Sequence, residues 1–161
     1  MMQHLDGEDQ RRLRLLFVTS AGGHLAQLMQ LGAWSSQHDR CWVTFKLPDA
    51  ENLLTGERVY WGYHPTTRSV RNLVRNGRLA WRVIRRERPD VIVSCGAAIA
   101  VPFFVIGRLH GARTTYVEVV DRLNTRTLTS RLVSPFTDLF ATQDEQQAEL
   151  FPGSVQIGRL L

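Results

Sequence analysis

Residues 13–28 read LRLLFVTSAGGHLAQL, and two glycines join an apolar run directly to a segment with helical spacing. Consecutive apolar residues, as at positions 15–18, are typical of a strand that is covered on both faces. The segment after the glycines repeats its apolar residues at three- and four-residue steps, as one face of a helix does. This stretch therefore predicts a strand, a glycine turn and a helix in direct succession.

The same alternation continues along the chain. Further strand-like runs are CWVTF (41–45), RVYWG (58–62), DVIVS (90–94), TTYVEVV (114–120) and DLFAT (138–142), and helical patterns cover residues 24–34, 66–88, 98–111 and 128–135. Thr142 and Glu145 are spaced like a capping box and predict one more short helix. The pattern predicts an α/β fold, with a Rossmann-like, mainly parallel sheet and helices on both faces.

The length of 161 residues fits one domain with an ordinary core. Residues 1–12 are polar, and we expect a disordered tail there and a single Rossmann-like domain over residues 13–161. The longest apolar run, residues 97–107, is shorter than the roughly 18 residues of a membrane span. Cys41 and Cys95 have no partner at metal-ligand spacing, so we expect two reduced, buried thiols and no metal site.

The formal net charge is +5, and 19 of the 20 basic residues are arginine. Such a balance favours anionic partners, among them phosphates, nucleic acid and lipid surfaces. The charge alone does not choose among these classes.

The glycine turn is the first candidate site. In a parallel sheet, ligands bind at the carboxyl ends of the strands, and Ser20, Gly22, Gly23 and His24 follow the first strand. Glycines let the backbone approach a phosphate closely, and a histidine can bind an anion or move a proton near neutral pH. The alternative is a plain turn with a solvated histidine. The turn is not a GxGxxG dinucleotide motif, a P-loop or a GxSxG nucleophile elbow.

Two later segments predict contributions to the same edge. Gly96 follows the strand DVIVS in a second small-residue turn, which either forms part of a cleft floor or only packs tightly. Glu118 ends the strand TTYVEVV, and Asp121, Arg122 and Asn124 follow it. A carboxylate at the end of an apolar strand is costly unless it has a partner or a ligand.

Arginines recur at helical spacing between residues 66 and 88. At about 100° per residue they share one face, and an apolar face adjoins it. The basic set is Arg68, Arg71, Arg75, Arg78, Arg82 and Arg85, and the apolar set is Val70, Leu73, Val74, Ala80, Trp81 and Ile84. Such a helix contacts an anionic membrane or nucleic-acid phosphates, or is a solvated face over a buried stripe. No recognition motif supports nucleic acid.

Three segments carry a resemblance to a known family: VTSAGGHLAQLMQL (18–31), PDVIVSCGAAIAVPFF (89–104) and YVEVVDRLNTRTLTSRLVSPFTDLFATQ (116–143). In order and spacing they resemble the acceptor-side subunit of the two-part UDP-N-acetylglucosamine transferase of the dolichol pathway. They are closer still to its bacterial counterparts in exopolysaccharide synthesis. A more distant similarity is to the N-terminal half of the peptidoglycan N-acetylglucosaminyltransferase. The resemblance covers residues 13–161.

The resemblance implies the N-terminal half of a GT-B glycosyltransferase that works without metal or cofactor. It implies an acceptor-binding subunit that, with a separate donor-binding subunit, transfers N-acetylglucosamine or another hexose to a lipid-diphosphate-linked saccharide. The implied catalytic residues are His24 and Glu118. The implied acceptor and phosphate contacts are Ser20, Gly22, Gly23, Gly96, Arg122 and Asn124.

We expect the protein to be cytoplasmic and peripheral on the inner face of the cell membrane. The expected contacts with an anionic membrane surface are Arg71, Arg75, Arg78, Trp81 and Arg82. The alternative function is a non-catalytic module that uses the basic helix to bind an anionic membrane or nucleic acid.

Overall fold

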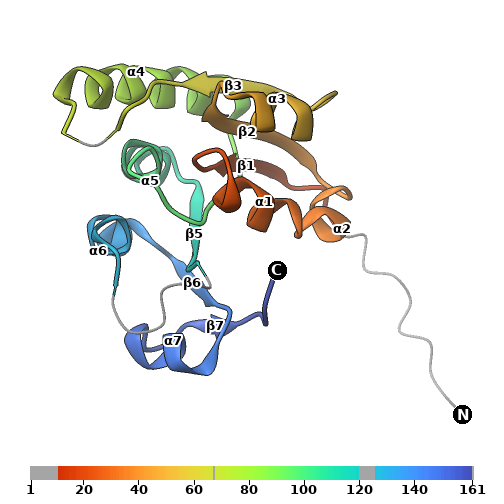
Figure 1. Cartoon of the computed structure of the whole chain (residues 1–161), viewed down its shortest axis with the longest axis vertical. Helices are drawn as coiled ribbons and strands as arrows, with labels where there is room; N and C mark the ends of the chain where they lie inside the picture. The colour runs from red at the N-terminus through yellow and green to blue at the C-terminus, as the bar shows by residue number, and fades with distance from the viewer. Residues whose placement is uncertain (1–10, 67, 120–125, 161) are drawn as a thin grey trace, which may run out of the picture.

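A computed structural model describes residues 11–66, 68–119 and 126–160. In this part of the chain a single seven-stranded sheet is entirely parallel, with the order β3-β2-β1-β4-β5-β6-β7 (Figure 1). The strands are β1 (Arg14–Val18), β2 (Asp39–Phe45), β3 (Val59–Gly62), β4 (Val91–Ser94), β5 (Arg113–Val117), β6 (Leu139–Thr142) and β7 (Val155–Gln156). The order reverses between β1 and β4, as in a Rossmann sheet, so the predicted fold class is confirmed.

Helices cover both faces of the sheet (Figure 1). They are α1 (Gly23–Met29), α2 (Gly32–Ser35), α3 (Pro48–Leu53), α4 (Val70–Glu87), α5 (Ala100–Leu109), α6 (Leu128–Val133), the 3-10 helix η1 (Ser134–Phe136) and α7 (Glu145–Leu150). One core layer holds buried side chains of α4, α5 and α6, and the other holds those of α1 and α3. Successive side chains of β1 point to opposite faces of the sheet. Leu16 and Val18 therefore pack in the first layer, and Leu15 and Phe17 pack in the second.

All six predicted strands are present, but several details differ from the prediction. The two-residue strand β7 and the six-residue helix α3 are too short to give a periodic pattern. The segment 24–34 forms two helices, α1 and α2, because the chain turns between Met29 and Gly32. The predicted capping box is wrong: Thr142 ends β6, and Asp144 caps α7 by accepting a hydrogen bond from the Gln146 N–H at 3.0 Å.

The predicted faces of the basic helix also need correction. α4 begins after Ser69, whose hydroxyl accepts from the Asn72 N–H, so Arg68 lies before the helix and off its basic face. Of the six residues of the predicted apolar face, only Ala80 and Ile84 are buried, whereas Val70, Leu73, Val74 and Trp81 are exposed, at 76%, 52%, 48% and 49%. The residues of α4 that are buried are Asn72, Asn76, Leu79, Ala80, Val83 and Ile84.

Asparagine amides explain this rotation of α4. The Asn76 side chain accepts from the Tyr63 N–H and donates to the Tyr63 C=O, each at 2.9 Å. Asn72 donates to the Pro65 C=O at 2.9 Å. The buried amides of Asn72 and Asn76 find their hydrogen-bond partners in the backbone of the preceding loop, as buried polar groups require, and so the first half of α4 turns its asparagines inward and its valines outward.

Replacing Asn76 by Ala should lower the free energy of unfolding by about 2 kcal/mol. The substitution leaves the N–H and C=O of Tyr63 without their partners, and an unmade buried hydrogen bond costs about 1–3 kcal/mol. Urea denaturation measures the change. Asn52→Ala is the matched control, because Asn52 is exposed on α3. Equal stability of the two variants would contradict the assigned role.

Candidate functional site

The first glycine turn lies at the carboxyl end of β1. Gly22 is the N-cap of α1 with φ 79° and ψ −142°, a conformation that essentially only glycine adopts. Gly23 is different, because its φ is not positive and an added Cβ would meet no atom within 4 Å. The fold therefore requires glycine at position 22, while the glycine at position 23 only keeps the space above the turn open. Ser20 lies beside them, half-buried.

A carboxylate accepts a hydrogen bond from the backbone of this turn. The Gly22 N–H donates to Oδ2 of Asp49 at 2.7 Å, and Asp49 is an exposed residue in the first turn of α3. An anionic ligand that takes the Gly22 N–H must displace this carboxylate. Asp49 was missed at the sequence level, because α3 gives too little periodicity to be predicted.

The second turn follows β4 and touches the first. Gly96 has φ +132°, and Ala97 is one of the few non-glycine residues of the described chain with positive φ, at 67°. A Cβ on Gly96 would lie 3.3 Å from the His24 ring and 3.4 Å from the Tyr116 hydroxyl. The absence of a side chain at Gly96 thus lets both His24, from α1, and Tyr116, from β5, approach the second turn closely.

A buried thiol ties the two turns together below His24. The Cys95 Sγ lies 3.3 Å from Oγ1 of Thr19 and donates to the His24 C=O at 3.0 Å. Burial raises the pKa of Cys95 to about 12, so the thiol stays protonated at neutral pH and acts as a hydrogen-bond donor. Cys41 is also buried, and both cysteines are free, as predicted.

Glu118 follows β5 and is only 1% exposed. Its backbone N–H donates to Ala141, and its C=O accepts from Nε2 of Gln143 at 2.8 Å. Gln143 also donates to Oε1 of Gln27 at 3.0 Å, which joins α1 to the ends of β5 and β6. The nearby carboxylate and, above all, burial raise the pKa of Tyr116 well above its ordinary value. Glu118 is therefore a buried group behind the turns. Arg122 and Asn124 lie outside the described residues.

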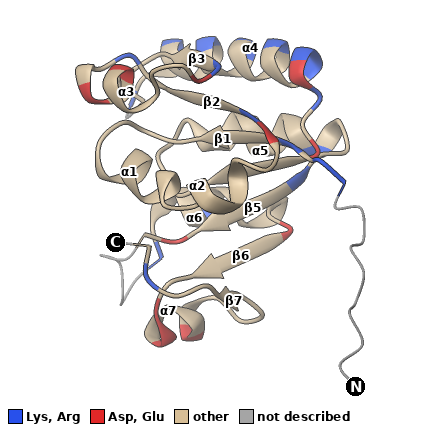
Figure 2. Cartoon of the chain, turned by 90° about the vertical axis from the view of Figure 1, so that its right-hand side faces the viewer, with Lys and Arg blue, Asp and Glu red and all other residues tan. Residues whose placement is uncertain are grey.

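The predicted membrane-contact residues lie on α4, away from the glycine turns. Figure 2 shows the arginines of α4 as a row along one side of the molecule. Arg71, Arg75, Arg78, Trp81 and Arg82 are all exposed. A shallow groove beside them is lined by Val74, Gly77, Trp81 and, from α5, Ile106. No helix of the described residues is long and apolar enough to cross a membrane.

Known proteins are similar to this chain in sequence, and solved structures are similar to it in fold. No protein-family model matches the chain. Over 92% of its length it is 27% identical to the rat UDP-N-acetylglucosamine transferase subunit ALG14, of which it covers 83%. It is 24% identical to the human ALG14 subunit over its whole length and 89% of that protein. The chain resembles these transferase subunits.

Solved structures support the fold. MurG from Acinetobacter baumannii matches 89% of the chain with a TM-score of 0.68 and 16% identity. UDP-N-acetylglucosamine 2-epimerase from Rickettsia bellii matches 92% with a TM-score of 0.71 and 12% identity. The chain covers 44% and 45% of these two proteins. The resemblance drawn from the sequence and the predicted GT-B-type, Rossmann-like fold are therefore confirmed.

Gly96→Ala should lower the free energy of unfolding by about 1–3 kcal/mol, because alanine is strained at φ +132° and its methyl group presses on the His24 ring. Gly23→Ala should change it little or raise it, because the site is open and alanine favours a helix. Urea denaturation of the two variants gives the comparison. A Gly23→Ala protein as unstable as Gly96→Ala would contradict the description of the turns.

Proposed function

We propose that this chain is the acceptor-binding subunit of a two-component glycosyltransferase. The enzyme transfers N-acetylglucosamine, or another hexose, from a nucleotide-sugar donor to a lipid-diphosphate-linked saccharide in polysaccharide biosynthesis. The observation that carries the proposal is the contact of the two glycine turns around His24 at the carboxyl edge of the sheet. The similarity to transferase subunits over nearly the whole chain supports it.

The proposed roles follow from the chemistry of the turn. The backbone amides of Gly22 and Gly23 bind the acceptor diphosphate once Asp49 has moved away, and Ser20 and Gly96 complete the contact surface. In the transfer step, an acceptor hydroxyl attacks the anomeric carbon of the donor sugar and the nucleoside diphosphate leaves. His24 takes the hydroxyl proton as general base. Glu118 acts from its buried position through its charge, and Arg122 and Asn124 contact the acceptor phosphates.

The donor binds to a separate polypeptide in this proposal. Transfer needs both substrates held in one orientation with water excluded, which a cleft between two domains provides. The curated relatives are themselves named as subunits of a transferase. This supports a partner that contributes the nucleotide-sugar site.

Gly23→Val and His24→Ala should each reduce transfer to a lipid-linked acceptor at least ten-fold. Valine closes the space through which a diphosphate reaches the backbone, and alanine removes the proposed base. The assay uses the chain purified together with the donor-binding subunit of the same organism. Mass spectrometry measures the product. Gly32→Val is the matched control, since a Cβ there also meets no atom within 4 Å.

The parent chain without its partner is the second control and should give no transfer. Unchanged denaturation midpoints would show that the losses are not unfolding. Full activity in both variants would leave the alternative function, a non-catalytic binding module, as the better account.

We further propose that the protein is cytoplasmic and lies on the inner face of the cell membrane through α4. Exposed apolar side chains, among them Val70, Leu73, Val74 and Trp81, alternate with arginines on this helix. A helix that exposes apolar and basic residues together is typical of one that lies in the interface of an anionic bilayer. Nucleic-acid phosphates would use the arginines but not the exposed valines, so a lipid surface is favoured.

Arg71→Gln combined with Arg82→Gln should weaken binding to vesicles that contain phosphatidylglycerol by about ten- to thirty-fold, since each well-placed arginine contributes about 1 kcal/mol. Trp81→Ala, which leaves the charge unchanged, should also weaken it. Co-sedimentation gives the affinities, and Lys46→Gln with Arg131→Gln is the control of equal charge change. If all these proteins bind alike, α4 is a solvated face.

A further inference from the structure

A second basic site lies at the amino edge of the sheet, opposite the glycine turns. A concave pocket of about 670 Å³ opens between the ends of α4 and α5 and the starts of β1, β4 and β5. Its polar wall carries Arg11, Arg14, Arg85, Arg88, His110 and Arg113. None of these residues belongs to the proposed acceptor site. The strands between the two edges are about five residues long, which separates the sites by roughly 16 Å.

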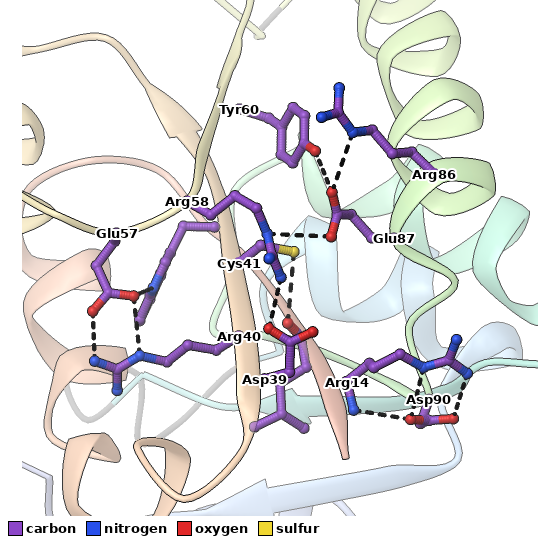
Figure 3. Close-up of polar contacts among 12 residues, drawn as sticks. Arg14, Asp39, Arg40, Cys41, Glu57, Arg58, Tyr60, Arg86, Glu87 and Asp90 are labelled. Carbon is purple, nitrogen blue, oxygen red and sulfur yellow. Dashed lines mark hydrogen bonds and ion pairs between the residues drawn. The ribbon is translucent and has the colours of Figure 1, made fainter. Parts of the chain in front are cut away.

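The only carboxylate in the pocket wall is already neutralised. Asp90 accepts from Nε and Nη2 of Arg14 at 3.2 and 2.9 Å, and from the Arg14 N–H at 2.9 Å (Figure 3). These bonds lower the pKa of Asp90 to about 2. Arg11 also approaches Asp90, at 3.7 Å. Five arginines against one carboxylate leave a pocket with an excess of four positive charges.

The neighbouring carboxylates cannot supply the missing negative charge. Figure 3 shows that Glu57 is paired with Arg40. Arg58 forms ion pairs with both Asp39 and Glu87, and the Tyr60 hydroxyl donates to Glu87. Among the described residues no carboxylate pairs with Arg85, Arg88 or Arg113, and Arg85 only approaches the Trp81 ring, at 5.6 Å.

Helix dipoles do not account for the excess either. α4 and α5 both end at this edge, and each helix end carries about half a negative charge. Together they offset about one of the four excess charges. Arg85 lies in the last turn of α4 and Arg88 is its C-cap, so the negative end of α4 acts on these two, whereas Arg113 begins β5 and belongs to no helix.

The pocket is also held rigidly. The Asp90 N–H donates to the Arg14 C=O and the Arg113 N–H to the Asp90 C=O, each at 2.9 Å, which fixes the starts of three adjacent strands. The His110 ring packs edge-on against Trp81 at 4.9 Å, and Ile84 and Ala112 form a buried apolar floor. A concave, fixed wall of guanidinium groups suits phosphate oxygens, which arginine binds through paired N–H donors.

We propose that this amino-edge pocket binds a phosphate or diphosphate group. The proposal does not rest on the acceptor site, because it uses different residues at the opposite edge. The phosphate can belong to a soluble phosphate ester or to a phospholipid headgroup. The second source is within reach because Arg85 lines both this pocket and the α4 groove.

Titration of the full chain with inorganic pyrophosphate, followed by amide NMR, tests the proposal. The Gly111 and Arg113 amides should shift with one saturating curve at constant ionic strength. Arg88→Gln with Arg113→Gln should weaken that affinity at least ten-fold, and neither side chain has a hydrogen bond or ion pair to lose within the described chain. Arg71→Gln with Arg131→Gln removes the same charge elsewhere and should leave the affinity within two-fold.

A second arm distinguishes the sources. If phosphatidylglycerol vesicles protect Arg88 and Arg113 from a guanidine-modifying reagent and phosphatidylcholine vesicles do not, the phosphate is that of a headgroup. If only pyrophosphate protects them, the ligand is a soluble phosphate ester. The proposal is overturned if neither protects them and the amides do not saturate, or if both double variants lose affinity equally.

Discussion

The parallel pairing of β1 with both β2 and β4 is the constraint on which the site depends. Because β1 lies between them, the chain must leave its carboxyl end in a turn that neighbours the turn after β4. Thr19 extends this register, with its N–H donating to Val43 at 3.0 Å. The reversal of strand order between β1 and β4 thus brings Gly22 and Gly96 to one edge, although more than seventy residues separate them in sequence.

Glycine backbone conformations and a buried thiol define the shape of that junction. Gly22 and Gly96 adopt positive φ, and Ala97 does so at a cost that alanine would avoid in a free chain. The contacts of Cys95 with Thr19 and with the His24 C=O stabilise the strained path. The fold therefore positions the His24 ring. Asp49 lies instead on an exposed short helix, and its carboxylate can move away from the turn at little structural cost.

The sequence predicted the sheet because consecutive apolar residues in β1, β2 and β4 are required by a strand that is covered on both faces. It also predicted the glycine turns, because glycines between a strand and a helix are a local signal. It did not predict which residues of α4 are buried. Asn72 and Asn76 bond to a loop that follows β3, and hydrophobic periodicity does not detect such partners. Tyr116 and Asp49 reach the site only through tertiary contacts, so no local pattern marks them.

α4 links the two edges of the molecule. Its 18 residues span about 27 Å at 1.5 Å per residue, from the loop at the carboxyl edge to the basic pocket at the amino edge. Because the asparagines turn inward, one exposed face carries valines, a tryptophan and arginines along this whole length. In the proposed membrane contact, this face would bring lipid headgroups to the amino-edge pocket, because Arg85 lies both beside the α4 groove and in the wall of that pocket.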